Sequence, residues 1–454
     1  MQASLRPRLC AMFFLEYLIR GAWQPLLGLY TGAKYLGFSG IEQAWVFNAF
    51  AMATLTGMFF GGQLADRVVS RRWFMAVSHT LGGLAIFGLA YVKSFWPFFG
   101  CMLVHCFFYV PTMAVSNAIV FAHVDDPKKD FGIIRLWGSV GWVAAAWPLI
   151  FIPIDWARVP AMAEMGGFIP WLGKALATLK TGPAMETALA GTFIVSSIAS
   201  LSLALLCLLG LPDSKSPPKR GEPFAPIEAF KLLGRPVVLV LWIVTFFDSV
   251  IHYGYYFWTS RYLQAIGLPE NWILPAMSIG QTMEVVTMVF LGGIIRRLGW
   301  RNTLLLGVLA QSVRFGVYAL GNSQIIGVVI AVNVVHGLAY ACFFATVYIF
   351  VDEQFPKDIR TSAQGLFNLM MFGIAQFAAN FLWGWLRGVF GTTQMVAGKA
   401  VEVINYHQLF LIPLGLSLGT ALFLAIFFDP EQVPTDDPEF LRPDADTALP
   451  VAAE

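Results

Sequence analysis

Long apolar stretches alternate with short polar connections along almost the whole chain. A helix needs about 20 mainly apolar residues to cross the hydrocarbon core of a bilayer. Segments of about this length cover residues 9–33, 43–63, 73–93, 96–121, 132–154, 188–211, 237–264, 272–295, 303–321, 324–351, 361–387 and 405–428. The pattern predicts an all-α membrane protein with twelve transmembrane helices.

A charged, Pro-rich stretch separates the sixth and seventh predicted spans and divides the spans into two sets of six. We therefore expect two six-helix bundles, a cytoplasmic linker between them and an acidic, disordered C-terminal tail. The expected boundaries are 1–211 for the N-terminal bundle, 212–236 for the linker, 237–428 for the C-terminal bundle and 429–454 for the tail. Transporters built from two such halves bind their substrate between the halves, near the midplane of the membrane.

The distribution of basic residues predicts the orientation. With both termini inside, eighteen lysines and arginines lie on the cytoplasmic side and eight on the other. This excess predicts cytoplasmic termini. The first apolar run contains Glu16 and Arg20 and has no clear small-residue cleavage site, so we expect a retained span rather than a signal peptide.

Residues 155–187 interrupt the pattern of short connections on the outside of the membrane. The segment is rich in Met, Ala, Gly and Trp. Two alternatives remain open: an interfacial helix over the extracellular mouth, or a disordered insertion.

Composition supports the membrane assignment and excludes other classes. The chain is 57% hydrophobic and 12% charged, with a mean hydropathy of +0.68, which is too apolar for a soluble globular protein. A net charge of +2 gives no reason to expect nucleic acid as a partner. The five cysteines lack metal-ligand or disulfide spacing, so we expect free thiols, no metal and no cofactor. A phosphate-binding loop and a serine-nucleophile motif are also missing from the sequence, which argues against an enzyme and leaves an ion gradient as the energy source.

Charged residues inside the predicted spans are few and therefore informative. Only three of the 27 acidic residues lie well inside spans, and they are accompanied by three arginines: Glu16, Asp248, Glu284, Arg20, Arg135 and Arg314. Each charge at the centre of a span costs roughly 2.5–3.5 kcal/mol, so each needs a partner or a water-filled cavity. Glu16 and Arg20 are four residues apart and could neutralise one another on one helix.

Two spans carry polar faces that predict a binding site. On the fifth span, Arg135, Ser139 and Trp142 recur at helical spacing. On the eighth, Gln281 and Glu284 are three residues apart; Gln281 can donate and accept, and Glu284 is a candidate proton carrier. A packing hydrogen bond, or a fixed ion pair between Glu284 and Arg135, is the structural alternative.

The seventh and tenth spans add polar aromatic side chains. Asp248, His252 and Tyr255 share a face of the seventh span, with Tyr253 and Tyr256 beside them, and Asn333, His336 and Tyr340 share a face of the tenth. The tyrosines could instead form an interfacial belt, and a membrane histidine could simply be a buried hydrogen-bonding group.

Several stretches together resemble a known family. Gly61-Gly-Gln-Leu-Ala-Asp-Arg67, followed by Arg71-Arg72, resembles the loop signature of the major facilitator superfamily. Four further stretches resemble the nucleoside:proton symporters within it: His79-Thr-Leu-Gly82, Tyr109-Val-Pro-Thr112, Ile134-Arg-Leu-Trp-Gly-Ser-Val-Gly141 and Ile359-Arg-Thr-Ser-Ala-Gln-Gly365.

The resemblance implies a nucleoside site in a central cavity between the bundles. Arg135 matches an arginine of the family, Ser139 stands at a threonine position and Trp142 at an aromatic one; Gln281 and Glu284 match a Gln-x-x-Glu pair that contacts the nucleoside.

The chain also departs from the family pattern. Tyr253 and Tyr256 replace amides of the seventh span, and Ala341, after Tyr340, replaces an acid of the tenth. Proton coupling would then fall to Glu284 or Asp248.

We therefore expect a monomeric, lipid-embedded transporter of the bacterial inner membrane that imports nucleosides with protons by alternating access. The expected substrate-binding residues are Arg135, Ser139, Trp142, Tyr253, Tyr256, Gln281, Glu284, His336 and Tyr340. Glu284, Asp248 and Arg135 are the proton-coupling candidates, and Gly61, Asp66, Arg67 and Arg71 the conformational loop motif. The alternatives are a carrier of sugars or other polyhydroxylated solutes, a nucleoside uniporter, and a receptor that does not transport.

Overall fold

A computed structural model gives the arrangement of most of the chain. It describes residues 5–67, 70–123, 127–212, 232–354, 364–396 and 399–430. Most of the expected linker and nearly all of the expected tail lie outside these residues.

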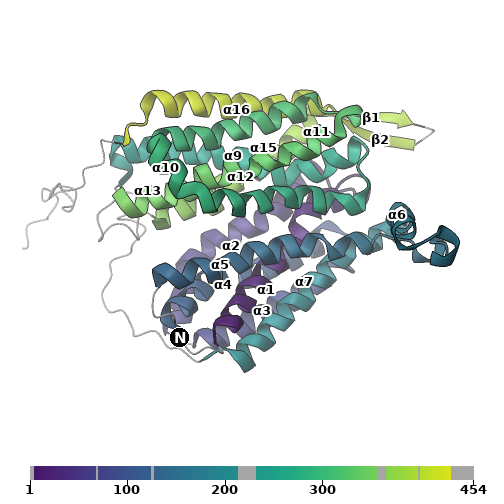
Figure 1. Cartoon of the computed structure of the whole chain (residues 1–454), viewed down its shortest axis with the longest axis horizontal. Helices are drawn as coiled ribbons and strands as arrows, with labels where there is room; N and C mark the ends of the chain where they lie inside the picture. Colours follow the sequence, from purple (N-terminus) through teal and green to yellow (C-terminus); the bar gives the residue numbers. More distant parts are fainter. Residues whose placement is uncertain are drawn as a thin grey trace, which may run out of the picture.

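The described helices form two bundles that lie side by side (Figure 1). The first contains α1 (Leu5–Tyr30), α2 (Gly40–Arg67), α3 (Arg71–Leu89), α4 (Phe95–His123), α5 (Pro127–Ala146) and α7 (Pro183–Gly210). The second contains α9 (Pro236–Ala265), α10 (Glu270–Leu320), α11 (Ile326–Ala331), α12 (Val335–Ala339), α13 (Thr346–Gln354), α15 (Gln376–Phe390) and α16 (Tyr406–Phe427).

Within the described residues, eight helical segments are long and apolar enough to cross a membrane. One of them, α10, runs for 51 residues and is bent at Gly299, whose φ of 73° lies in the left-handed region that favours glycine. The bend separates the two stretches that the sequence predicts as the eighth and ninth spans, so α10 contributes two antiparallel arms to its bundle.

Two predicted helices contain π-helical turns that the sequence analysis missed. Between α12 and α13 lies η7 (Tyr340–Ala345), and directly before α15 lies η8 (Met370–Ala375). Single π-helical turns within α-helices are rare overall. Where they do occur, they often lie at functional sites. Apolar periodicity cannot reveal them, because a π-turn leaves the surrounding sequence as apolar as before.

The segment 155–187 is ordered, so the alternative of a disordered insertion is wrong. It contains the short helical turns η2 (Trp156–Arg158) and η3 (Met162–Met165), followed by α6 (Phe168–Ala177). An isolated β-bridge between Ile154 and Leu179 closes its base. Asn271 of α10 donates to the carbonyl oxygen of Leu176 at 3.0 Å, which fastens the segment to the other bundle.

A β-hairpin before α16 was also not expected from the sequence. It pairs β1 (Gly391–Val396) with β2 (Lys399–Ile404) in antiparallel register, with Gly391 opposite Ile404. The hairpin and α6 project from the same end of the molecule, and the first residues of α1 lie at the opposite end (Figure 1).

At the hairpin end the two bundles are in close contact. A Cβ atom on Gly40 of α2 would lie 2.0 Å from the carbonyl oxygen of Gly384 of α15. A Cβ atom on Gly28 of α1 would lie 2.6 Å from the carbonyl oxygen of Phe257 of α9. Only glycine permits these crossings, which leave no passage between the paired helices here.

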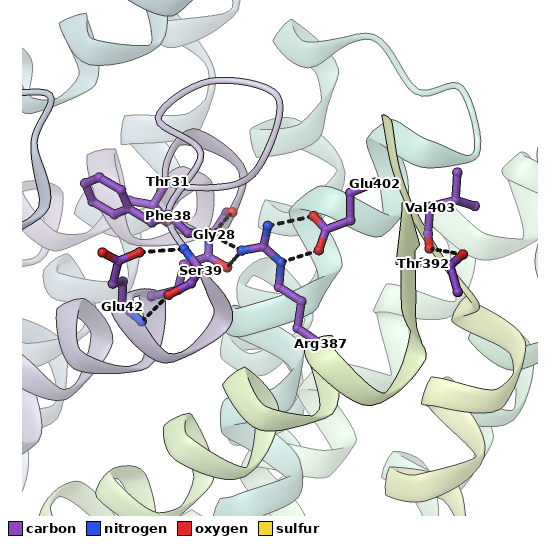
Figure 2. Close-up of polar contacts among 10 residues, drawn as sticks. Gly28, Thr31, Phe38, Ser39, Glu42, Arg387, Thr392, Glu402 and Val403 are labelled. Atoms are coloured by element: carbon purple, nitrogen blue, oxygen red, sulfur yellow. Dashed lines mark hydrogen bonds and ion pairs between the residues drawn. The ribbon is translucent and has the colours of Figure 1, made fainter. Parts of the chain in front are cut away.

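Polar contacts reinforce this closed end. Figure 2 shows the guanidinium of Arg387, near the end of α15, between Glu402 of the hairpin and the start of α2. Arg387 donates to both carboxylate oxygens of Glu402, to the carbonyl oxygen of Phe38 and to Gln43 Oε1.

A second polar contact lies at the same end, where Lys34 pairs with Glu270 at 2.6 Å. Tyr35 donates to that same carboxylate at 3.0 Å. Burial and the Glu270 carboxylate raise the pKa of Tyr35, so its phenol stays protonated as a donor.

Candidate functional site

A cavity lies between the two bundles, with about 850 Å³ of empty space when its open side is included. Its lining residues are Tyr17, Arg20, Gln24, Arg135, Ser139, Trp142, Ser249, His252, Tyr253, Tyr256, Gln281, Glu284, Tyr340, Phe344, Tyr348, Met371 and Phe372. The predicted faces of the fifth, seventh, eighth and tenth spans therefore meet at one place.

On the N-terminal side, close packing of α5 on α1 places the first group of side chains. A Cβ atom on Gly141 would lie 2.0 Å from the carbonyl oxygen of Phe14, so the two helices touch backbone to backbone there. Arg135 Nη2 donates to the hydroxyl of Tyr17 at 2.5 Å, and its guanidinium lies 4.2 Å from the centre of that ring. Because the Tyr17 phenol is neutral, it does not balance the positive charge of Arg135. It holds the guanidinium at the cavity wall through the hydrogen bond and the cation–π contact.

Trp142 extends this wall toward the other bundle. Its ring meets Tyr256 edge to face, with 6.2 Å between centroids. Ser139 lines the cavity on the same face of α5. The cavity thus has a flat aromatic boundary with a hydroxyl and a cation next to it.

The expected pairing of Glu16 with Arg20 does not form within the described residues. Glu16 is fully buried and accepts a hydrogen bond from Thr112 of α4 at 3.1 Å. Arg20 points into the cavity instead, donates to Gln24 and lies over the ring of Phe50, 3.9 Å from its centroid. The prediction failed because helical spacing shows which residues can meet and not which outside partners compete for them.

On the C-terminal side, two glycines bring α10 and α12 together. A Cβ atom on Gly337 would lie 2.3 Å from the carbonyl carbon of Met283, and one on Gly280 would lie 2.9 Å from His336 Cβ. This contact places Gln281 3.1 Å from the hydroxyl of Tyr256 and 3.3 Å from His336 Nε2.

Glu284 has no hydrogen bond or ion pair among the described residues. The alternative of a fixed ion pair with Arg135 is therefore wrong, since no nitrogen–oxygen distance between them is within 4.0 Å. Both side chains line the cavity. A carboxylate that faces a cavity without a protein partner is available to a ligand or a proton.

The remaining predicted residues lie on or behind the same wall. Tyr253 and Tyr256 line the cavity, so the alternative of an interfacial belt is wrong for these two tyrosines of the seventh span; Tyr340 lines the cavity as well. His336 is fully buried behind Gln281, and Asp248 is fully buried with neither carboxylate oxygen hydrogen-bonded in the described structure. Neither His336 nor Asp248 lines the cavity.

Arg314 is a buried cation that interacts with both His336 and Asp248. It is fully buried, donates to His336 Nδ1 at 2.6 Å and to Gln311, and lies 4.3 Å from the centre of the Tyr255 ring. Asp248 interacts with it electrostatically. The sequence analysis named no partner for Arg314.

The sequence analysis also missed several lining residues. Tyr17 and Gln24 share a face with Arg20 at helical spacing, a signal that could have been found in the sequence. Phe344 and the pair Met371 and Phe372 lie in the π-turns η7 and η8, where the helical spacing is disturbed. Phe344 and Tyr348 follow Tyr340 at intervals of four residues, a signal that the sequence contains, whereas Met371 and Phe372 have no such signal.

Other family stretches serve packing or lie outside the described side chains. Tyr109 and Thr112 of α4 both bond to Glu16, and His79 of α3 contacts Ser200 of α7 at 3.4 Å. In the loop motif, Arg71 donates to the carbonyl oxygen of Ala118 at 3.3 Å. The side chains of Asp66 and Arg67, like residues 359–363, lie outside the described part, and Gly61 belongs to α2.

Two helical bundles with a polar cavity between them form a fold that this chain shares with solved membrane transporters of the major facilitator type. Solved structures of this type support the fold: that of the nucleoside transporter NupG matches with a TM-score of 0.76 and 21% identity, over 94% of this chain and 100% of that one. A D-xylose–proton symporter matches with a TM-score of 0.68 and 14% identity, over 95% and 99%.

The family model described as nucleoside H+ symporter matches residues 1–433, and the chain belongs to this family. Relatives in Escherichia coli K12 include YegT, 28% identical over 83% of each chain. The nucleoside permease NupG is 24% identical and the xanthosine permease 25%, each over 95% of this chain and 98% of the relative. The protein is an integral membrane transporter and not an enzyme.

Proposed function

We propose that the protein imports nucleosides together with protons by alternating access across the bacterial inner membrane. The observation that carries this proposal is the convergence of Arg135, Gln281 and Glu284 on one cavity between the bundles. Family membership and the permease relatives support the same substrate class.

The proposed topology has twelve spans in two bundles of six, bounded as the sequence predicts, with both termini in the cytoplasm. The bent helix α10 supports two spans within one continuous helix. The end that carries α6 and the hairpin would then face outward. Because the bundles touch at that end, the described conformation would be closed to the outside.

The proposed recognition of the nucleoside uses flat walls and polar edges. Trp142, Tyr256 and Tyr340 would stack against the base, since a base is a flat apolar ring with polar edges. Ser139 and Gln281 would bond hydroxyl groups or the base edge, with Tyr253 closing the wall.

Glu284 is the proposed proton carrier. Its carboxylate lies in the cavity near the substrate residues and is not held by a described partner, whereas Asp248 lies behind the wall beside Arg314. Arg135, across the cavity, would stabilise the charged form of Glu284 when the proton leaves.

A binding panel tests the substrate class. Purified protein is heated with uridine, adenosine, the free bases, ribose or D-xylose, and its unfolding temperature is recorded. Stabilisation by nucleosides above that by sugars or bases supports the proposal. Stabilisation by sugars alone would replace it with a sugar carrier, which the tyrosine-rich wall also fits.

A further inference from the structure

Behind the cavity wall, a buried cation holds a histidine in one orientation. Arg314 lies at 0% exposure and its Nη1 is 2.6 Å from His336 Nδ1. The His336 ring is stacked on His252, with 5.3 Å between centroids, and lies 4.9 Å from Tyr255. A Cβ atom on Gly280 would lie 2.9 Å from His336 Cβ, so α10 packs closely against this side chain.

This contact determines which ring nitrogen of His336 carries the proton. An arginine guanidinium is always protonated and can only donate, so Nδ1 must accept. A doubly protonated ring would put a second positive charge against Arg314 and leave the short contact without an acceptor. His336 is therefore neutral, with its proton on Nε2.

The proton on Nε2 in turn orients Gln281. In the structure the nitrogen end of the Gln281 amide lies 3.3 Å from His336 Nε2 and 3.1 Å from the hydroxyl of Tyr256, to which it donates. A nitrogen at this end would face the N–H of His336 donor to donor. The two ends of an amide have the same shape, and their order is assigned from the hydrogen-bond network. With the oxygen at this end, it accepts from both His336 and Tyr256.

The other end of Gln281, its NH2 group, is then left for a ligand in the cavity that Gln281 lines. An amide NH2 group can only donate hydrogen bonds. It therefore binds a carbonyl oxygen of a ligand, whereas an amino group at the same place would be a second donor without an acceptor. Hydroxyl groups of a ribose donate and accept, so they would not reveal this polarity; a base edge would.

We propose that Arg314 and His336 are positioning residues that fix Gln281 as a hydrogen-bond donor, so that the site favours nucleosides with a carbonyl over those with an amino group at the same position of the base. This inference rests on the proposed function. Arg314 and His336 lie behind the cavity wall, so they would not touch a ligand and would act on it only through Gln281.

Two pairs of nucleosides test it, because each exchanges an oxygen for an amino group at nearly constant shape: uridine against cytidine, and inosine against adenosine. Each competes for uptake of labelled uridine into proteoliposomes, and the ratio of inhibition constants within a pair is independent of the amount of protein. For the wild type we expect the carbonyl member to inhibit at about tenfold lower concentration in at least one pair, the effect of one mismatched buried hydrogen bond.

Variants then separate a positioning role from a structural one. Arg314→Gln can donate or accept and frees the tautomer of His336, so the ratio should fall below about threefold. His336→Phe keeps the ring stacking and removes the N–H, and should have the same effect even if Arg314→Gln does not fold. Arg314→Lys still donates to Nδ1 and should keep the ratio of the wild type.

The outcomes test nucleoside transport and the donor role of Gln281 separately. If no nucleoside inhibits or is taken up, the proposed function fails. If nucleosides are carried but both ratios are near one, favour the amino member, or are unchanged in Arg314→Gln and His336→Phe, the inference about Gln281 is overturned while the proposed function stands.

Discussion

Arg387 holds Glu402 through two hydrogen bonds of 2.7 and 2.6 Å and, from the same guanidinium, donates to Gln43 of the opposite bundle at 2.8 Å. The hairpin thus balances the charge of an arginine that joins the two bundles (Figure 2). Because these contacts exist only while this end is closed, they stabilise the closed conformation relative to the open one.

Arg387→Met should therefore shift the protein toward opening at the hairpin end. Hydrogen bonds to charged groups contribute about 1.5–3 kcal/mol each, so the loss of those to Phe38 and Gln43 should give a measurable open population. Spin labels on Ala33→Cys and Thr393→Cys, in a background without the five native cysteines, report the separation across this end. We expect a longer distance component in Arg387→Met. Arg158→Met, which removes an exposed ion pair with Asp155, is the control; identical distributions in both variants would contradict the role of Arg387.

Glu284→Gln should abolish accumulation driven by a proton gradient and leave exchange of substrate between the two sides. The amide keeps the shape of the side chain but cannot take up and release a proton. Asp248→Asn makes the same chemical change behind the wall and should retain accumulation. If accumulation survives in Glu284→Gln and is lost in Asp248→Asn, coupling belongs to Asp248.

Gly141→Ala should reduce both stability and uptake, because its Cβ would lie 2.0 Å from the carbonyl oxygen of Phe14 and would force α5 away from α1. Overpacking of this kind costs about 1–3 kcal/mol. Gly415→Ala on α16 meets nothing within 4 Å and is the matched control. The unfolding temperature and the initial rate of uptake measure the difference; equal values for the two variants would show that α1 and α5 do not need this contact.

Tyr17→Phe should raise the KM for nucleoside about tenfold or more, since Arg135 loses the hydroxyl that holds it at the cavity wall, and a hydrogen bond to a charged group contributes about 1.5–3 kcal/mol. Tyr91→Phe removes a hydroxyl from a side chain that is 66% exposed and should leave KM unchanged. Initial rates over a range of substrate concentrations give both values. An unaltered KM in Tyr17→Phe would mean that Arg135 does not depend on Tyr17.

The sequence predicted several of the cavity side chains that lie on regular helices, although Tyr17 and Gln24 of α1 were missed. Arg135, Ser139 and Trp142 share a face because the helical repeat places them there, and the same repeat places Gln281 beside Glu284. Where the partner of a side chain lies on another helix, the sequence analysis made no prediction or a wrong one. Glu16 bonds to Thr112 rather than to Arg20, and Arg314 finds His336, because each contact joins helices whose relative placement no spacing rule contains.

Local backbone variation limited the prediction in a different way. The π-turn at Met370–Ala375 changes the helical repeat locally, and Met371 and Phe372 within it line the cavity without a periodic signal in the sequence. The hairpin of Gly391–Ile404 lies in a connection to which no regular element was assigned from the sequence. Its role in holding Arg387 follows only from the three-dimensional arrangement.

Uptake of labelled uridine and adenosine into proteoliposomes tests the central claim most directly. Purified protein is reconstituted, and uptake is followed with an imposed inward proton gradient, with the gradient collapsed by a protonophore, and in liposomes without protein. The account predicts saturable uptake of at least one nucleoside and concentration above the outside level only with the gradient. The absence of saturable uptake of either nucleoside, with or without the gradient, would contradict it.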